Sequence, residues 1–302
     1  MHVSAKTRFS YFLMPCGILL AIFSIVNIIG HAFLLEGLHR YYGLHKSQIL
    51  CVGHSMSAMG IDKCLLEKQT GKKVSKYTMS GVGICERRIM LNQYVETTNS
   101  FPDIVVYDVS ARIFSNGLSE NAYALFYPFL EESPSIDRMI RGEASYGEYL
   151  RKKLIPLTRY EDLSVAEAVR GWRGDWTNRT IKRFDHVAFE KRFAEGLFWH
   201  ISFEENAMLE FDETLKWLND NGCEVILACL PSVDILNALE PDKHSQAMSL
   251  LQNYSLKYAH VHLLDLNGEF SQNYALFADP IHLNPYGQII ITKELAKYIN
   301  GL

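Results

Sequence analysis

The chain has 302 residues, with 30 Lys and Arg against 34 Asp and Glu, so its formal net charge is −4. Proteins that bind nucleic acids normally carry an excess of basic residues, and we therefore expect no nucleic-acid partner. Hydrophobic residues make up 48% of the chain and charged residues 21%, which excludes a largely disordered protein.

An apolar segment near the N-terminus is long enough to cross a membrane. Residues 9–35 contain no Asp, Glu, Lys or Arg, and residues 11–35 would form a helix of roughly 38 Å at ~1.5 Å per residue. We therefore expect a tail at 1–10, a transmembrane anchor at 11–35 and a folded domain at 36–302. A cleaved signal peptide and a buried core helix are the alternatives. The apolar part of a signal peptide is shorter, about 7–15 residues.

The charges that flank this segment are nearly balanced across it. Lys6 and Arg8 precede it, and Arg40 and Lys46 follow it. Cytoplasmic flanks usually carry the larger number of basic residues. The working expectation is a single-pass protein of the cell membrane, with a short tail inside and an extracytoplasmic domain.

After the anchor, short apolar runs alternate with helical patterns. The expected strands are 48–52, 74–79, 104–109, 225–230 and 261–266, and the expected helices are 61–70, 85–98, 205–219, 244–258 and 288–299. This alternation predicts a flavodoxin-like three-layer α/β sandwich with a mainly parallel sheet covered by helices on both faces. In such sheets, ligands bind beyond the carboxyl ends of the strands.

Residues 113–203 do not follow this alternation. They contain Trp172, Trp176 and Trp199 among mixed charges and many aromatic residues. We interpret the stretch as a helical insertion, because a structureless loop of this length is uncommon inside a compact domain. It could act as a cap that shapes a substrate pocket, or serve only as packing.

Two short motifs carry residues suited to nucleophilic catalysis. Gly-His-Ser-Met-Ser follows the first expected strand and offers Ser55 at a strand end, while Asp279-Pro-Ile-His282 precedes the last helix. A serine nucleophile needs a base near neutrality, which histidine provides, and a carboxylate can hold the tautomer of that histidine. Each motif alone has ordinary structural explanations, such as a helix N-cap or a turn.

The two motifs together resemble those of the SGNH hydrolases, also called GDSL esterases, over most of residues 48–299. In that family the first block is Gly-Asp-Ser-x-Ser and the last is Asp-x-x-His. The resemblance therefore implies Ser55 as nucleophile, His282 as base and Asp279 as its orienting acid, with His54 replacing the usual Asp. Asn284, in the His-Leu-Asn-Pro-Tyr-Gly continuation, would cap or brace the loop.

The two middle blocks of the family match less well. The resemblance implies a glycine whose amide helps to stabilise the oxyanion, at Gly83 or, as second choice, at Gly81. The asparagine of the third block is missing, and Arg112 stands at about its place. A guanidinium could donate to an oxyanion, hold an anionic substrate or form a structural ion pair with a carboxylate of the insertion.

The resemblance implies a membrane-anchored serine esterase or O-acyltransferase that acts on ester-linked acyl groups, such as acetyl, of a cell-envelope polysaccharide. It implies no metal and no organic cofactor, and the six cysteines show no metal-binding spacing. The alternatives are a catalytically inactive SGNH-like subunit of an envelope assembly or modification complex, with biosynthetic partners, and a lipase-like enzyme that acts on membrane lipids.

Overall fold

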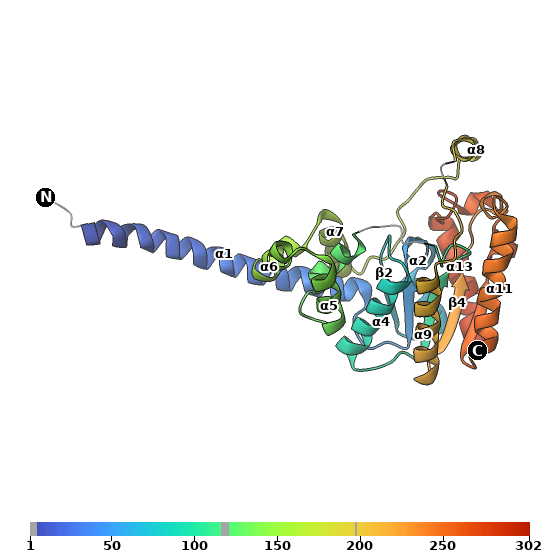
Figure 1. Ribbon diagram of the computed structural model, residues 1–302, viewed down its shortest axis with the longest axis horizontal. Coiled ribbons are helices and arrows are strands. Elements are labelled where there is room, and N and C mark those ends of the chain that lie inside the picture. Colours follow the sequence, from blue (N-terminus) through green and yellow to red (C-terminus); the bar gives the residue numbers. More distant parts are fainter. Residues whose placement is uncertain (1–4, 116–120, 197) are drawn as a thin grey trace.

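The computed structural model describes residues 5–115, 121–196 and 198–302, and its centre is a five-stranded parallel sheet in the order β2-β1-β3-β4-β5 (Figure 1). The strands are β1 (Ile49–Gly53), β2 (Val74–Thr78), β3 (Ile104–Val109), β4 (Glu224–Cys229) and β5 (Val261–Asp265). In register, Ile49 pairs with Val74 on one side and with Ile104 on the other. The predicted α/β fold with a parallel sheet is confirmed.

Both faces of the sheet are covered, which explains why the strands are apolar along their whole length rather than alternating. One face packs against α4 (Ile84–Thr98) and α9 (Glu205–Asp220), and the other against α2 (Ser55–Gly60), α3 (Lys63–Thr70) and α13 (Pro285–Gly301). The remaining helices of the sheet domain are α11 (Pro241–Lys257), which packs on β5, and the short α10 (Asp234–Asn237), α12 (Asn267–Phe270) and η3 (Tyr274–Leu276).

The expected helix at 61–70 corresponds to α3, which begins two residues later, at Lys63. A separate short helix that was not expected, α2, begins at Ser55 directly after the first strand, and Ile61 then takes an extended conformation that ends it. Asp62 caps α3 by accepting a hydrogen bond from the Leu65 amide at 2.9 Å. A carboxylate at this position satisfies an amide that lacks a partner within the helix.

The N-terminal helix α1 (Ala5–Tyr42) extends beyond residue 35, the expected end of the apolar segment. Its first half projects away from the sheet domain in Figure 1, and residues 14–26 are exposed. Its last turns belong to the domain, because Leu38 and Tyr42 are buried in the core. The helix therefore connects an exposed apolar rod with the folded body without interruption.

The insertion is helical where it is described, and it consists of two parts. The elements η1 (Ala122–Phe129), α5 (Pro134–Glu143), α6 (Tyr146–Leu154), η2 (Pro156–Arg159) and α7 (Asp162–Arg173) form a layer beside α1 and α4, and α8 (His186–Ala194) stands apart on an arm (Figure 1).

Helix α7 crosses α1 at very close range. A Cβ atom on Gly171 would lie 1.9 Å from the carbonyl oxygen of Gly37, so this crossing requires glycine. Beside it, the Trp172 indole donates to the Phe33 carbonyl at 3.0 Å and the Trp176 indole donates to the Tyr41 carbonyl at 2.7 Å. The first part of the insertion therefore clamps the end of α1.

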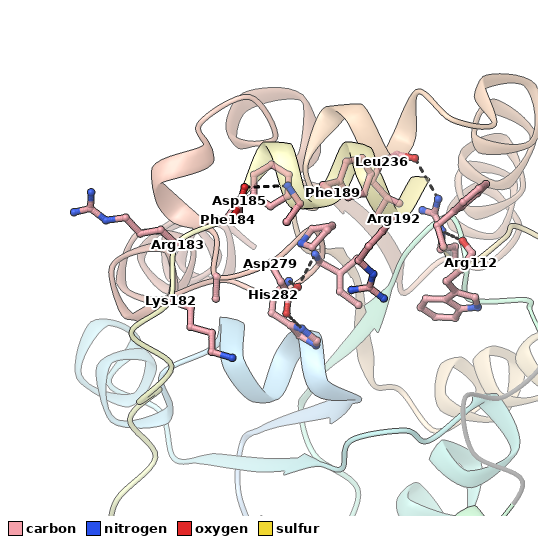
Figure 2. Close-up of a pocket in the computed structure, with 16 residues that line it drawn as sticks. Arg112, Lys182, Arg183, Phe184, Asp185, Phe189, Arg192, Leu236, Asp279 and His282 are labelled. Carbon is pink, nitrogen blue, oxygen red and sulfur yellow. Dashed lines mark hydrogen bonds and ion pairs between the residues drawn. The ribbon is translucent and has the colours of Figure 1, made fainter. Parts of the chain in front are cut away.

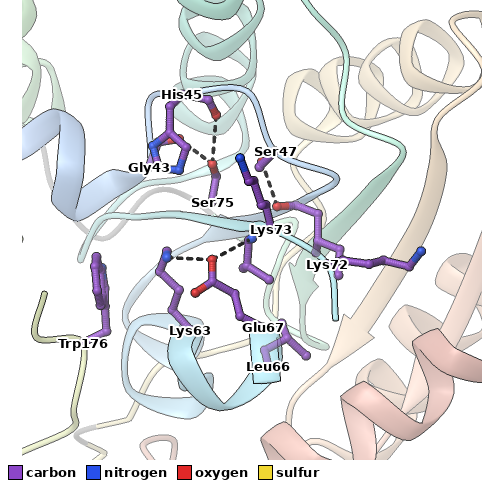
Figure 3. Close-up of polar contacts among 12 residues, drawn as sticks. Gly43, His45, Ser47, Lys63, Leu66, Glu67, Lys72, Lys73, Ser75 and Trp176 are labelled. Carbon is purple, nitrogen blue, oxygen red and sulfur yellow. Dashed lines mark hydrogen bonds and ion pairs between the residues drawn. The ribbon is translucent and has the colours of Figure 1, made fainter. Parts of the chain in front are cut away.

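A second set of contacts fixes the short connection between α1 and the sheet (Figure 3). Ser75 on β2 donates its hydroxyl to the carbonyl of Gly43 at 2.5 Å. Nearby, Glu67 accepts from the Val74 amide at 3.0 Å and from Lys63 at 2.9 Å. Helix α1, strand β2 and helix α3 are thus tied together at one corner of the molecule.

Candidate active site

Ser55 is the first residue of α2 and lies directly beyond the carboxyl end of β1. The turn between strand and helix is very tight. A Cβ atom on Gly53 would lie 2.3 Å from the Ser57 hydroxyl oxygen and 2.4 Å from Cβ of Asp108. Glycine at position 53 therefore allows β1 to approach β3 closely and turn at once into the helix that carries Ser55.

The structure brings Ser55, His282 and Asp279 into one chain of hydrogen bonds. The Ser55 hydroxyl lies 2.8 Å from Nε2 of His282, and Nδ1 of His282 lies 2.7 Å from Oδ2 of Asp279. A carboxylate on Nδ1 holds the proton there, so Nε2 is left to accept the proton of the serine. Ser55 and His282 are 227 residues apart in sequence. In the folded protein they lie within the hydrogen-bonding distance that proton transfer from a serine to a histidine requires.

The loop that carries His282 is held by its own carboxylate. The other oxygen of Asp279, Oδ1, accepts from the amides of Ile281 and His282 at 3.0 and 2.9 Å. Burial would raise the pKa of Asp279, but His282 and these amides outweigh it and lower the pKa. Asn284 then caps α13 through the amides of Tyr286 and Gly287 at 3.0 Å, which braces the loop.

A second carboxylate, Asp108 on β3, supports the turn that carries Ser55. Its Oδ2 accepts from the Ser57 hydroxyl at 2.8 Å and from the amides of Ser57 and His54 at 3.2 and 3.3 Å. Burial would raise its pKa, but His54, Arg87 and the Ser57 hydroxyl lower the pKa to about 2. Asp108 is therefore ionised at neutral pH and fixes the position of Ser55 through the turn before α2.

His54, which replaces the aspartate of the family motif, is buried and does not face solvent. Its Nδ1 lies 3.1 Å from the Met56 amide and 3.1 Å from Oδ2 of Asp108. Unprotonated, Nδ1 accepts from Met56 and caps α2; protonated, it donates to Asp108. In either form the imidazole belongs to the support of the turn.

The two candidate oxyanion glycines differ in conformation. Gly81 has a φ of +85°, whereas Gly83 has a φ of −92° and is the N-cap of α4. A need for positive φ therefore explains Gly81 but not Gly83. The amide of Gly83 donates to the carboxylate of Glu86 at 2.8 Å, so in this structure the proposed oxyanion donor already has an anionic partner.

Arg112 follows β3 and is buried, with 3% of its surface exposed. Its Nε donates to the Trp199 carbonyl at 2.5 Å and its Nη2 to the Leu236 carbonyl at 3.2 Å. Within the described residues it forms no ion pair, so the expected structural pairing with an insertion carboxylate is not found there. The side chain instead joins the insertion to α10, which follows β4.

Arg112, His282 and Asp279 line one cavity of about 460 Å³, shown in Figure 2. His282 and Asp279 line one side, and the arm around α8 lines the other with Phe184, Phe189 and Arg192. A cavity of this size holds a small organic ligand. The second part of the insertion therefore forms a wall of the candidate pocket, while the first part packs on α1.

The sequence interpretation missed the role of Asp108 and the basic side chains of the arm. Asp108 carried a usable signal, because it is the only charged residue in the otherwise apolar run 104–109, and a charge in a buried strand needs a partner. The arm carried no such signal. For metals, no group of three suitable side chains occurs in the described part of the chain.

Comparisons with known proteins give similarity to solved structures only. No family model and no curated protein matches the chain. A carbohydrate esterase family 2 enzyme from Myceliophthora fergusii aligns at 11% identity and a TM-score of 0.43, covering 85% of this chain and 66% of that one. A family two carbohydrate esterase from Clostridium thermocellum aligns at 8% identity and a TM-score of 0.38, covering 84% and 63%.

The chain thus spans slightly less than two thirds of the length of these two esterases. At these TM-scores the likeness carries no information about the reaction. The chemistry of the site has to follow from its own side chains.

Proposed function

We propose that the chain is a membrane-anchored serine esterase or O-acyltransferase of the SGNH hydrolase type, acting on ester-linked acyl groups of a cell-envelope polysaccharide. The observation that carries the proposal is the hydrogen-bonded chain Ser55, His282 and Asp279, with distances of 2.8 and 2.7 Å. Its position beside a cavity at the carboxyl ends of the strands supports it further.

In the proposed reaction, Ser55 Oγ attacks the ester carbonyl carbon while His282 Nε2 takes the hydroxyl proton. The bond to the alcohol breaks, His282 returns the proton to the leaving alkoxide, and the acyl group stays on Ser55. Water, or a sugar hydroxyl in a transferase, then attacks the acyl-serine and restores the free enzyme. Asp279 keeps the imidazole oriented and stabilises its protonated form.

The membrane anchor is supported by what α1 exposes and by what it contacts. The most apolar 18-residue stretch within residues 14–42 has a mean hydropathy of 2.4. Only 6% of that stretch is buried against the rest of the protein. The part of α1 that precedes Asn27 and carries no charged residue, residues 9–26, is roughly 27 Å long at ~1.5 Å per residue, close to the hydrocarbon thickness of about 30 Å.

Contacts with the domain begin at that point. The Asn27 side chain accepts from the Leu157 amide at 3.3 Å, and His31 lies 2.7 Å from the Tyr160 hydroxyl. Cleavage of a signal peptide after residue 35 would remove both contacts and the Phe33 carbonyl that Trp172 uses. These contacts favour a retained anchor over a cleaved signal.

A fluorophosphonate probe tests the catalytic part of the proposal. The full chain in detergent should form a covalent adduct at Ser55, located by mass spectrometry. Ser55→Ala and His282→Ala should abolish labelling, because loss of a triad member typically costs several orders of magnitude in rate. Ser255→Ala, on α11 and outside the pocket lining, is the serine control and should retain the adduct at Ser55. Labelling that survives in Ser55→Ala would contradict the proposal.

One observation favours the second candidate function, an inactive SGNH-like subunit of an envelope assembly or modification complex. Gly83 donates its amide to Glu86 instead of leaving it free, and Arg112 replaces the usual oxyanion asparagine. Glu86→Ala distinguishes the two functions. In an enzyme this variant should label at Ser55 at least as fast as the wild type, whereas an inactive subunit should remain unlabelled in both forms.

A further inference from the structure

The pocket beside the triad contains more positive than negative side chains, although the whole chain is slightly acidic. Its lining includes the basic side chains of Arg112, Lys182, Arg183 and Arg192, and the acidic ones of Asp185 and Asp279. Figure 2 shows Arg192 directed from α8 toward the His282 side of the cavity, whereas Arg183 points away. The two guanidinium groups that concern the cavity interior are thus Arg112 and Arg192.

The acidic side chains near the pocket already have partners. Asp279 binds His282, and Asp185 caps α8 by accepting from the Ala188 amide at 3.0 Å. Glu240, whose charge acts on Arg112, is paired with Lys243 at 2.7 Å and accepts from the Ile201 amide at 2.8 Å.

Neither Arg112 nor Arg192 forms an ion pair with a carboxylate anywhere in residues 5–115, 121–196 and 198–302. Arg112 uses Nε and Nη2 for main-chain carbonyls, and its Nη1 has no hydrogen-bond partner among those residues. A buried guanidinium that is held only by carbonyls remains costly, because a formal charge in a poorly solvated site is stabilised chiefly by an opposite charge.

We infer that this pocket binds an ester substrate that carries an anionic group, a carboxylate or a phosphate, held by Arg112 and Arg192 next to Ser55. The planar guanidinium fork matches both anions and binds either with two parallel hydrogen bonds. The rings of Phe184, Phe189 and Trp199 supply apolar walls for the rest of the ligand. This inference rests on the proposed esterase function and specifies its substrate class.

Matched pairs of esters test the inference with the full chain in detergent. The first pair is an O-acetylated methyl glucuronoside and the corresponding glucoside, and the second is acetylated glycerol phosphate and acetylated glycerol. We expect kcat/KM to favour the charged member of at least one pair by about tenfold to a hundredfold, the range of one charge-assisted hydrogen bond. The pair that shows the larger preference separates carboxylate from phosphate.

Arg192→Gln should reduce that preference about tenfold or more, mainly through KM of the charged ester. Lys191→Gln, a neighbour on the same helix that does not line the pocket, is the matched control and should keep the preference. Added salt should reduce the preference of the wild type, because it screens the charge of a partly open site.

Binding measured by calorimetry with Ser55→Ala separates this inference from the esterase proposal. Tighter binding of the charged ester, without hydrolysis by the wild type, supports the anionic pocket and contradicts the esterase. Hydrolysis of both members of each pair at equal kcat/KM, together with equal binding, supports the esterase and overturns the anionic pocket.

Discussion

At the scale of single residues, the turn that holds Ser55 depends on one buried negative charge. Asp108 is ionised, and His54 lies 3.1 Å from its carboxylate. Aspartate, the usual residue of the family motif at position 54, would place a second carboxylate against the first. Aspartate at position 54 would match the SGNH motif better, but it would destabilise this turn by charge repulsion with Asp108.

We predict that His54→Asp lowers the free energy of unfolding at pH 7 by roughly 3–5 kcal/mol, the usual cost of an uncompensated buried charge. The two carboxylates would share a proton whose folded-state pKa lies above the unfolded value of about 4. The loss should therefore shrink as the pH falls through that raised pKa. Urea unfolding at pH 7 and pH 5 measures it.

His54→Asn is the control for this variant, because a neutral amide can still cap α2 through the Met56 amide. If His54→Asp is as stable as His54→Asn at pH 7, then Asp108 does not carry a charge in the folded protein.

The meeting of Ser55, His282 and Asp279 could be predicted from sequence because Ser55 and His282 each lie within a short local motif at a strand or helix boundary. Asp108 and Arg192 could not be predicted in the same way. Their roles depend on contacts between segments that are distant in sequence. Asp108 acts because β3 lies beside β1, and Arg192 because the arm around α8 lines the pocket. Neither contact can be read from local residue spacing. Arg112 was found only because its position matched a block of the resembled family.

At the scale of elements, the crossing of α1 and α7 is the tightest helix contact in the described part of the chain for which a glycine is needed. We predict that Gly171→Ala destabilises the protein by about 1–3 kcal/mol or more, since the new Cβ atom meets the Gly37 carbonyl at 1.9 Å and packed backbones relax little. Denaturant unfolding in detergent, followed by tryptophan fluorescence, measures this change.

Gly142→Ala is the matched control. It lies in α5, where a Cβ atom would meet nothing within 4 Å, so the change should be neutral or stabilising by up to ~1 kcal/mol. Equal effects of the two substitutions would show that α7 does not hold α1 at this crossing.

The strands of the sheet and the helices around it were predictable because hydrophobic periodicity and turn residues are local properties of the sequence. Each end of the five expected strands lies within one residue of its observed position. It was not predictable that the first part of the insertion would pack on α1 while the second part would line the pocket. The sequence left open whether the segment with Trp172 and Trp176 caps a pocket or serves as packing. Both side chains donate to carbonyls of α1, and nothing in the spacing of the tryptophans indicates which surface they contact.

At the scale of the whole molecule, one acidic group couples the insertion to α1. Glu167 on α7 accepts from the Tyr42 hydroxyl at 2.6 Å. Burial raises the pKa of Glu167 to about 7, against the opposing effects of Tyr42 and Arg170. A raised folded-state pKa means that folding takes up a proton between roughly pH 4.5 and 7.

The stability that Glu167 contributes should therefore be fully present below about pH 4.5 and should be lost as the pH rises through about 7. We predict a loss of about 2 kcal/mol or less between pH 5 and pH 8, since partial exposure screens the effect. In Glu167→Gln the loss should be smaller, because glutamine accepts the same hydrogen bond without titrating. An unchanged pH dependence in this variant would mean that another group is responsible.

The side of the membrane can be tested with cysteines that the chain already has. Cys64 and Cys85 are exposed on the sheet domain, whereas Cys51, Cys223 and Cys229 are buried. If the domain is extracytoplasmic, a membrane-impermeant maleimide should label Cys64 and Cys85 in intact cells. Cys64→Ser with Cys85→Ser is the control. Labelling that appears only after lysis would place the domain in the cytoplasm.

The connection between α1 and β1 consists only of residues 43–48, and Ser75 holds its first residue. A domain on a flexible linker can reach a distance from its attachment point that increases with the length of the linker. This chain has no such linker between α1 and β1, so helix packing sets the position of Ser55 relative to the apolar part of α1. Lengthening the connection with glycine and serine would not let the sheet domain move further from α1 unless the α1–α7 contact were also released.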